Sequence, residues 1–376
     1  MNRSRRREEA DFGFNHVFRR VTSAATKLRF LGQVIALAFL VPAMLALKPT
    51  FGEPSTLLSP WLAKRARVFV VEDLTAIRAF NPQPERIQAM VDRGLEAVTG
   101  RNTVASAWRN LVSTQDVVGI KVFSSPGPTS GTRPAVVAAV VKSLLDTGFP
   151  AAQIVVWDKQ IADLQRAGFL GFAERFGIRV AGSADEGYDE KTFYDTSLIG
   201  KLVWGDFEFG KKGEGVGRNS YVSKLVTKKI TKIINVTPLL NHNLAGVSGN
   251  LFGLAFGSVD NILRFESGPQ HLASAIPEIY ALPELGDRVV LNIVDALICQ
   301  YQGDEKMYLQ YSAMLGQLRF SADPVALDVL SIDELNRQRQ LAKIPPVIPN
   351  FQIYTNASQL ELGVSDFRGI DLIKGP

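Results

Sequence analysis

Along the body of the chain, the apolar residues fall into two kinds of run that differ in length and in period. Short, continuous apolar runs between polar residues are typical of strands that are buried on both faces of a sheet. Six of them predict strands, at residues 67–73, 116–123, 153–158, 178–182, 228–236 and 288–297. Longer runs with apolar residues every three or four positions predict helices, at residues 84–100, 133–148, 161–177 and 323–336.

The residues at the ends of two of these helices support their limits. Pro84 and Pro324 stand in first turns, where a missing backbone N–H removes no helical hydrogen bond. Gly100 is suited to end the first helix, because glycine tolerates the left-handed conformation there. Asp323 is placed to cap the last helix with its carboxylate.

The order of these elements indicates the fold class. Strands and helices alternate from residue 116 to residue 182, which favours a parallel sheet with right-handed crossovers. Residues 183–222 are more polar, and residues 202–210 alternate between apolar and polar, which predicts an inserted antiparallel flap. We therefore expect an α/β domain at residues 67–376, with a mostly parallel sheet and flanking helices.

Residues 30–47 form a long apolar run without a formal charge. As a helix these 18 residues would span about 27 Å, close to the roughly 30 Å of a bilayer core. The basic residues 1–29 would stay on the cytoplasmic side, which places the body on the outer side. An uncleaved transmembrane anchor, the apolar part of a signal peptide and a buried helix are the alternatives. Residues 48–66, with three prolines, then read as a linker.

The charge and cysteine content exclude several classes of protein. The 376 residues carry a formal net charge of +5, and residues 1–29 account for all of it, with eight basic and three acidic residues. Residues 30–376 are therefore neutral overall and show no bias towards nucleic acid. The single cysteine, Cys299, excludes an intramolecular disulfide, a zinc finger and a cysteine-ligated iron–sulfur cluster.

Four polar residues stand at or near the carboxyl ends of predicted strands. They are Lys121, Asp158, His242 and Asp295. Ligands of open parallel sheets bind beyond the carboxyl ends of the strands, so we expect these side chains to line one pocket. A lysine, two carboxylates and an imidazole suit proton transfer, redox or hydrolytic chemistry, and the four are the candidate catalytic residues.

The segment "NVTPLLNHNLAGVSGN", residues 235–250, places further polar groups beside His242. Pro238 is expected to end the strand, because its fixed φ and missing N–H turn a chain out of a sheet. The residues after it would form a loop, where functional side chains are commonly displayed. The candidate ligand-binding residues are Asn241, Asn243, Ser248, Asn250 and, in a later helical stretch, His271.

Each candidate also has a structural interpretation. His242 could cap its loop through backbone hydrogen bonds, and Asp158 could cap the helix that follows it. The glycines near residue 250 suit either an anion cradle or tight packing. A metal held by His242, His271 and a carboxylate is an alternative, but no ligand spacing such as His-Glu-x-x-His is present, so we assign no metal. The sequence identifies no cofactor. The basic residues between 211 and 232 fit a solvated face or a face towards anionic lipids.

Five segments in one order resemble the bacterial and archaeal family called domain of unknown function 362. They are "GIKVF…TRPAVVAAVVKSLLDTGFPAAQIVVWD", "IINVTPLLNHNLAGVSGNLFGLAFG", "LNIVDAL", "SADPVALDVLSIDEL" and "LGVSDFRGIDLI", within residues 110–374. Lys121 and His242 match the family pattern, whereas Phe123 and Leu240 replace its Asn and Lys. Some members carry ferredoxin-type cysteine clusters, which this chain lacks.

These observations lead to two hypotheses for the function. The first is a membrane-anchored or exported enzyme that acts on a small polar or anionic substrate at the edge of the sheet. The second is a non-catalytic binding protein for a small anion or a partner in the cell envelope. The sequence specifies neither the substrate and reaction nor the oligomeric state.

Overall fold

The computed structural model describes residues 65–304 and 306–375 of the protein. The predicted apolar segment 30–47, its basic flank 1–29 and nearly all of the linker 48–66 lie outside these residues. Within the described part of the chain, no helix is both long enough and apolar enough to cross a membrane. The N-terminal anchor or signal therefore stays a prediction.

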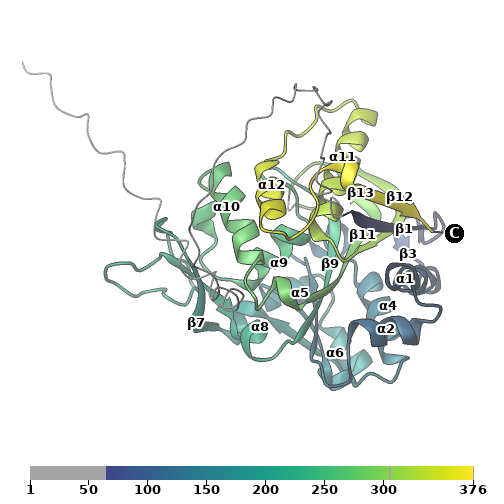
Figure 1. The fold of residues 1–376 in the computed structure, drawn as a ribbon, viewed down its shortest axis with the longest axis horizontal. Helices are drawn as coiled ribbons and strands as arrows, with labels where there is room; N and C mark the ends of the chain where they lie inside the picture. The colour runs from purple at the N-terminus through teal and green to yellow at the C-terminus, as the bar shows by residue number, and fades with distance from the viewer. Residues whose placement is uncertain (1–64, 305, 376) are drawn as a thin grey trace, which may run out of the picture. The chain divides into compact units, whose positions relative to one another are not determined.

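The centre of the fold is a nine-stranded sheet, in the order β13-β1-β12-β11-β9-β4-β5-β6, with β10 beside β9 (Figure 1). Neighbouring strands from β11 to β6 are parallel, and β12 is antiparallel to both of its neighbours. The predicted α/β class with a mostly parallel sheet is confirmed. The strands are β1 (Ala66–Glu72), β4 (Val118–Val122), β5 (Ile154–Asp158), β6 (Arg179–Gly182), β9 (Lys232–His242), β10 (Gly246–Val247), β11 (Val289–Gln300), β12 (Ser312–Ser321) and β13 (Ile370–Lys374).

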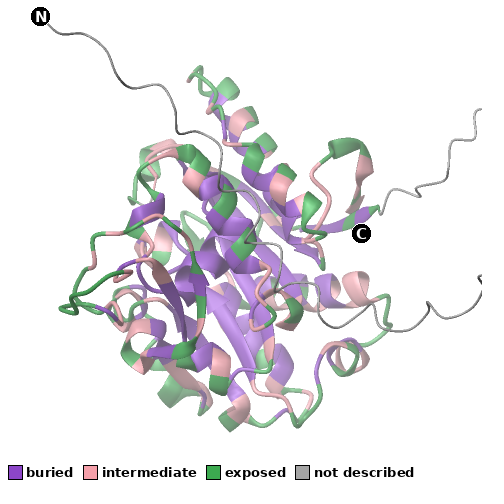
Figure 2. Ribbon diagram, turned by 60° about the vertical axis from the view of Figure 1, so that its left-hand side comes forward, coloured by how far each residue is buried: buried purple, intermediate pink, exposed green. Residues whose placement is uncertain are grey.

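Helices cover both faces of this sheet. Successive strand residues point to opposite faces, and apolar residues on both faces are buried against helices. Ile154 and Val156 pack into one core with α1, α2, α4, α5 and α6, whereas Val155 and Trp157 pack into the other core with α8 to α12. Figure 2 shows the buried strands enclosed between the two layers. The helices are α1 (Pro84–Thr99), α2 (Val104–Leu111), α4 (Pro134–Leu145), α5 (Ile161–Arg166), α6 (Gly171–Phe176), α8 (Lys224–Lys228), α9 (Asn250–Ser258), α10 (Pro269–Tyr280), α11 (Pro324–Leu341) and α12 (Gln352–Gln359).

Most of the predicted elements have the expected limits. The first four predicted strands correspond to β1, β4, β5 and β6, each within two residues at either end. Gly100 ends α1 with a φ of 64°, and the Asp323 carboxylate accepts a hydrogen bond from Ala326 N at the start of α11. One predicted helix, residues 161–177, is instead two short helices, because Gly168 between them has a φ of 88°.

The inserted flap is built differently from the prediction. Its antiparallel pair consists of β7 (Tyr188–Asp195) and β8 (Asn219–Ser223), and residues 202–210 lie in the connection between them. These residues form turns rather than a strand. The Asp206 carboxylate accepts a hydrogen bond from Val203 N, and Gly205 has a φ of 103°, so alternating polarity here does not reflect a pleated strand.

The prediction that the strand before His242 ends at Pro238 is wrong. β9 continues to His242, and β11 likewise continues past Asp295 to Gln300. Pro238 stands opposite Asp295 where the regular β9–β11 pairing breaks, so its missing N–H removes no regular ladder hydrogen bond. Beyond the break, Asn241 and His242 pair with β10, which keeps them in the sheet.

Candidate functional site

Lys121 and Asp158 form a buried ion pair at the carboxyl ends of β4 and β5. Lys121 Nζ lies 2.7 Å from Asp158 Oδ1 and donates a second hydrogen bond to the Val122 carbonyl at 2.6 Å. The other carboxylate oxygen accepts hydrogen bonds from the backbone N–H and the hydroxyl of Ser124. Since both charges are paired and solvated by protein groups, the pair can be retained at little cost in this buried position.

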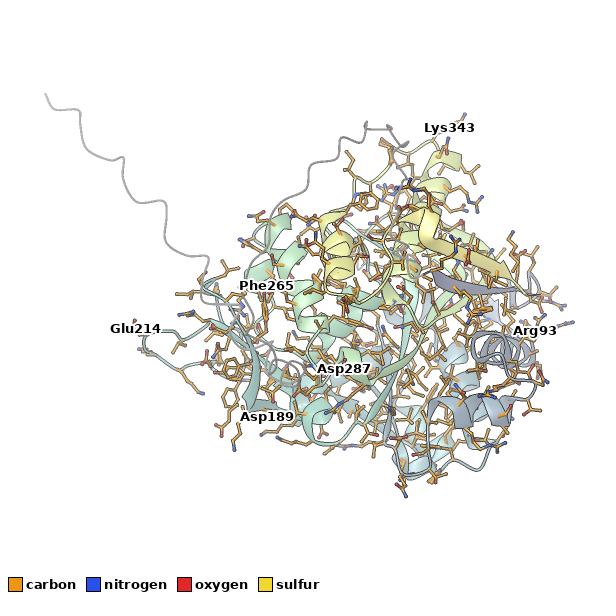
Figure 3. The ribbon with its side chains drawn as sticks, viewed as in Figure 1. Arg93, Asp189, Glu214, Phe265, Asp287 and Lys343 are labelled. Carbon is orange, nitrogen blue, oxygen red and sulfur yellow. The ribbon has the colours of Figure 1, made fainter. Side chains whose placement is uncertain are left out.

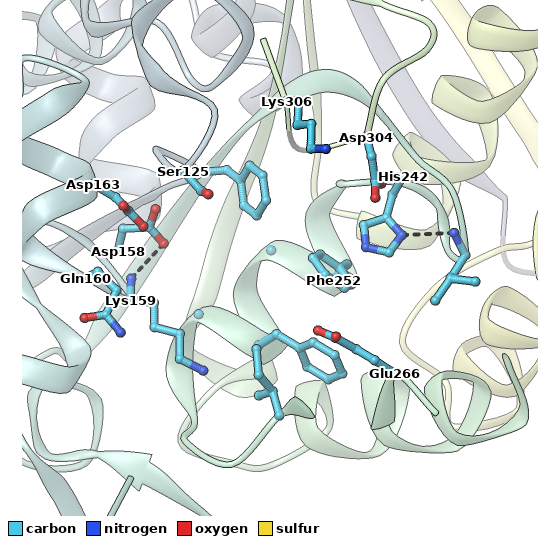
Figure 4. A pocket seen from close by; sticks show the side chains of 16 residues that line it. Ser125, Asp158, Lys159, Gln160, Asp163, His242, Phe252, Glu266, Asp304 and Lys306 are labelled. Carbon is cyan, nitrogen blue, oxygen red and sulfur yellow. Dashed lines mark hydrogen bonds between the residues drawn. The ribbon is translucent and has the colours of Figure 1, made fainter. Parts of the chain in front are cut away.

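A cleft of about 400 Å³ opens beside this pair (Figure 4). Its floor is helix α9, and its rim comes from the segments that follow β4, β5, β9 and β11. The lining combines aromatic rings with polar groups of both charges. The residues are Phe123, Ser125, Asp158, Lys159, Gln160, Asp163, His242, Leu244, Phe252, Gly253, Phe256, Gly257, Ile262, Glu266, Asp304 and Lys306.

Lys159 and Lys306 both line the cleft without an ion pair to a described residue, and Lys159 is the less exposed of the two. Its side chain is half-buried, and Nζ makes no hydrogen bond or ion pair with any described residue. Burial lowers the pKa of Lys159 to about 8, although the carboxylates of Asp206, Asp260 and Asp158 act in the opposite direction. A substantial fraction of the amine is therefore neutral near pH 8, whereas an exposed lysine is almost fully protonated there.

His242 faces the cleft as a neutral donor. Its Nδ1 accepts hydrogen bonds from Ala245 N at 3.0 Å and Leu244 N at 3.3 Å. Its ring packs against Phe252, with the centroids 4.3 Å apart, and burial lowers the pKa of the imidazole against the opposing effect of Asp304. Because Nδ1 is an acceptor for two N–H groups, the proton of the neutral ring resides on Nε2.

The acidic groups of the cleft differ in how they are balanced. Asp163 is paired with Arg166, and burial followed by the charge of Asp158 raises the pKa of its carboxyl. Burial also raises the pKa of Glu266, which no described residue pairs. Once the pairs of Asp158 and Asp163 are set aside, two lysines and two carboxylates remain, namely Lys159, Lys306, Glu266 and Asp304. The cleft therefore presents both signs of charge.

Asp295 does not line this cleft. Its carboxylate lies 2.9 Å from Arg133 Nη1 and also accepts a hydrogen bond from Arg133 N at 3.0 Å. The same guanidinium donates to the carbonyl groups of Thr129 and Ile298. Both side chains are buried, so the pair joins the start of α4 to the middle of β11. Of the four residues predicted to line one pocket, Asp158 and His242 line the cleft, whereas Asp295 and Lys121 do not.

Two of the candidate asparagines belong to the support of the cleft rather than to its lining. Asn241 is buried, accepts a hydrogen bond from Arg339 Nη2 at 3.0 Å and donates to Asn243 Oδ1. Asn243 is exposed, and its backbone N–H donates to Asp304 at 2.9 Å. That contact holds the connection after β11 against the His242 turn.

The glycine-rich segment is not a free loop. Asn250 begins helix α9, and the backbone N–H groups of Asn250 and Leu251 donate to the carboxylate of Asp328 on α11. The start of the helix is therefore already occupied by an anion of the protein itself. Ser248 is buried, and its hydroxyl makes no hydrogen bond among the described residues. The prediction that one loop carries Asn241, Asn243, Ser248 and Asn250 is wrong at Asn241, which lies in β9, and at Asn250, which begins α9.

His271 lies in the first turn of α10, outside the cleft lining. Its Nδ1 lies 2.9 Å from the hydroxyl of Ser267. Within residues 65–304 and 306–375, no group of three or more His, Cys, Asp or Glu side chains is placed to hold a metal ion.

The sequence interpretation missed Lys159, which lines the cleft directly beside Asp158. The same reasoning about strand ends applies to it, since it is the first residue after β5. Glu266 and Asp304 carried no comparable signal, because they come from connections that only the tertiary fold brings to the cleft. Roles for all these residues stay predictions.

The comparisons with known proteins identify the family of the chain. The family model "Domain of unknown function (DUF362)" matches residues 118–333. The chain belongs to this family. The match spans β4 to α11 and includes the residues Lys121, Asp158, Lys159 and His242, so the resemblance noted in the sequence is confirmed.

No curated protein matches the chain. Among solved structures, the chain is similar to a structural-genomics protein from Thermotoga maritima, with a TM-score of 0.39 and 10% sequence identity. The similarity covers 71% of this chain and 61% of that one, which is less than two thirds of its length.

Proposed function

We propose that the cleft beside Lys121 and Asp158 is the active site of an enzyme that transfers a proton to or from a small polar substrate. The observation that carries this proposal is Lys159, a half-buried amine without a partner whose pKa is lowered to about 8. General bases work best when their pKa lies near the working pH, and an ordinary lysine does not meet this condition.

The proposed step begins with the neutral amine of Lys159. Nζ removes a proton from the substrate and becomes an ammonium group, while the electron pair of the broken bond stays on the substrate. The Nε2–H of His242 donates a hydrogen bond to the oxygen on which negative charge develops. His242 does not act as the base, because its Nδ1 is held by Leu244 N and Ala245 N and its Nε2 carries the proton.

The charges of the cleft favour a polar substrate over an anionic one. Lys159 and Lys306 stand with Glu266 and Asp304, so a polyanion would meet repulsion as well as attraction. A polar or zwitterionic molecule can satisfy both signs. The rings of Phe252 and Phe256 give it an apolar surface on the side of α9. We therefore propose a small zwitterionic substrate rather than a simple anion.

Hydrogen exchange at a carbon atom of the substrate tests this function, and the natural substrate need not be known. The full-length protein is incubated in D₂O with a panel of amino acids and 2-oxo acids, and deuterium at the acidic C–H position is measured by mass spectrometry. We expect exchange in the wild type and a loss of at least about 100-fold in Lys159→Met, the usual size of a general-base effect. Lys142→Met on the exposed surface of α4 is the matched control.

Two results would overturn the enzymatic proposal. Binding of panel compounds without any exchange would instead support the alternative of a non-catalytic binding protein. Exchange that Lys159→Met leaves intact would show that another group removes the proton. Calorimetric titration with the same compounds distinguishes binding from chemistry.

We also propose that residues 30–47 anchor the protein in a membrane with its body on the outer side. The support is the uncharged apolar run and the basic residues before it. Export after cleavage of a signal is the alternative. The two differ in the N-terminus of the mature chain, which mass spectrometry of the protein from its native cells identifies, and in resistance to extraction at alkaline pH.

A further inference from the structure

The connection between β7 and β8, residues 196–218, projects from the body (Figure 1). It carries large apolar side chains that are exposed. Trp204 is 87% exposed, Ile199 is 65% exposed and Phe209 is 51% exposed. We call residues 196–218 the flap loop. Side chains of this size are rarely left in water together unless they contact a partner.

The carboxylates of Asp206 and Asp260 hold the flap loop in this conformation. Asp206 accepts hydrogen bonds from Val203 N at 2.8 Å and from Asn261 N at 2.9 Å. Asp260 accepts hydrogen bonds from Phe207 N and Tyr221 N, at 2.7 Å and 2.6 Å. The base of the flap loop is therefore fixed to the body, and its apolar side chains are presented from a defined support.

A second set of carboxylate contacts closes the loop on itself. Glu208 accepts hydrogen bonds from Gly217 N and from the Tyr221 hydroxyl, both at 2.8 Å. Glu208 is buried, and both carboxylate oxygens of Asp206 accept backbone hydrogen bonds. Among the fully exposed charged residues of the flap loop, the lysines therefore outnumber the acidic residues.

Exposed lysines accompany the exposed apolar side chains in the flap loop. Lys201, Lys211 and Lys212 are exposed and form no ion pair with a described residue, and Lys211 Nζ lies 4.0 Å from the centre of the Phe207 ring. Glu214 is the exposed acidic residue of the loop and lies at its far end (Figure 3). Tryptophan beside lysine is typical of the interface between water and lipid, where the indole enters the headgroups and lysines meet anionic lipids.

The sequence also keeps the body within reach of a membrane. Seventeen residues separate the apolar segment 30–47 from Arg65, the first described residue. Even fully extended, they span at most about 60 Å, so an anchored chain cannot carry its body far from the bilayer. A loop that reaches outward from the body can then touch the surface to which the chain is tethered.

We infer that the flap loop is a membrane contact, which inserts Trp204 and its apolar neighbours among anionic lipid headgroups. This inference rests in part on the anchor proposed above and not on the chemistry of the cleft. A membrane contact also gives a reason for the apolar residues at 202–210. These residues alternate between apolar and polar, but they do not form a strand.

Quenching of tryptophan fluorescence by brominated lipid tests this contact. The full-length Trp61→Phe protein is placed in vesicles of phosphatidylcholine and phosphatidylglycerol in a ratio of about 7:3. Trp108 and Trp157 are buried, so Trp204 is the exposed indole that remains. We expect bromolipid to reduce its emission about twofold, and to reduce it much less when Lys201, Lys211 and Lys212 are changed to Glu.

The matched control moves the indole to another exposed position. Ile348 is 90% exposed, and Ile348→Trp in the chain that also carries Trp61→Phe and Trp204→Phe should escape quenching. Equal quenching at both positions, or quenching that the charge reversals leave unchanged, would overturn the inference. So would an indole at 204 shielded from acrylamide but not quenched by bromolipid, because protein would then cover the loop.

The anchor is tested separately in the same samples. Failure of the anchor appears as release of the protein from vesicles at alkaline pH, whereas failure of the flap contact appears as retained protein with an unquenched Trp204.

Discussion

Gly257 of helix α9 lies directly against the side chain of Lys121. A Cβ atom at Gly257 would fall 2.3 Å from Lys121 Cε and 2.6 Å from Lys121 Nζ. Only a residue without a side chain lets α9 pass this close to the buried ion pair. The helix that floors the cleft and the pair that supports it are therefore joined at one glycine.

The first prediction follows from this contact. Gly257→Ala should lower the free energy of unfolding by about 1–3 kcal/mol, because Lys121 must move away from Asp158 to make room. Gly253→Ala in the same helix is the matched control, since the nearest atoms would lie 3.7 Å away. It should change stability by less than about 1 kcal/mol, in the stabilising direction, because alanine favours helix more than glycine does. Urea unfolding measures both, and equal losses would contradict the proposed contact.

The second prediction concerns the ion pair itself. Lys121→Met should lower the free energy of unfolding by about 3–5 kcal/mol, because it leaves the Asp158 carboxylate buried without its counter-charge. Adding Asp158→Asn should recover part of the loss, since the uncompensated charge is then gone. Chemical denaturation of the single and double variants gives the coupling free energy. A double variant that is no more stable than Lys121→Met would argue against the pair as the source of the loss.

The third prediction uses the lowered pKa of Lys159, about 8 against the ordinary value near 10.4. Between about pH 8 and pH 10 the unfolded chain keeps a proton that the folded chain has released, so this group makes stability rise with pH in that window. Lys159→Met should remove this rise. It should also increase the free energy of unfolding at pH 7, because it removes a charge that is destabilised by burial. We expect an increase of only about 1–2 kcal/mol, because solvent screens a half-buried charge. Thermal unfolding of both proteins from pH 6 to pH 10 provides the comparison.

Competitive labelling gives an independent measure of the same amine. With acetic anhydride at a series of pH values, the acetylation of Lys159 should reach half its maximum near pH 8, well below the value near 10.4 of an ordinary lysine. A half-maximum near the ordinary lysine value would mean that the cleft does not perturb Lys159.

The fourth prediction separates the two roles of His242. His242→Asn retains an acceptor for Leu244 N and Ala245 N but removes the Nε2–H that faces the cleft. It should keep most of the stability and lose activity in the exchange assay. His242→Ala removes the acceptor as well and should cost about 1–3 kcal/mol. If Asn and Ala lower stability equally while exchange persists in both, His242 is a structural residue.

The fifth prediction concerns the N-terminal region. The described residues 65–304 and 306–375 belong to one compact unit, so a truncated chain of residues 60–376 should fold and stay soluble without detergent. Circular dichroism and sedimentation velocity would show a folded, dispersed protein. Aggregation of the truncated chain, with a full-length protein that folds in plain buffer, would place the apolar run 30–47 in the core instead of a membrane.

The sequence alone was enough to determine the central layers of the fold. β4 and β5 are buried on both faces, so their apolar runs are continuous and their limits are clear. The helices α1 and α11 carry proline and glycine or aspartate at their ends, which mark their limits locally. Because these signals depend on neighbouring residues, they can be read without knowing the rest of the structure.

Tertiary structure decided how far two strands extend and where their polar residues lie. Pro238 would end an isolated strand, yet β9 continues past it. The regular pairing of β9 with β11 breaks after Pro238, and β10 becomes the new partner of Asn241 and His242. The apolar pattern predicts that a strand ends near Asp295, but β11 continues to Gln300. The Asp295 carboxylate pairs with Arg133 at the start of α4, which is 162 residues away in sequence. No local pattern encodes such a partner.

The composition of the cleft was likewise a tertiary property. Asp158 and His242 were expected at one edge because parallel strands align their carboxyl ends, and both do line the cleft. Glu266 and Asp304 reach it through connections of irregular length, and the burial that lowers the pKa of Lys159 comes from the packed fold. The sequence determines which side chains are available, whereas long-range packing determines their neighbours, and those neighbours set the charge and the chemistry of the site.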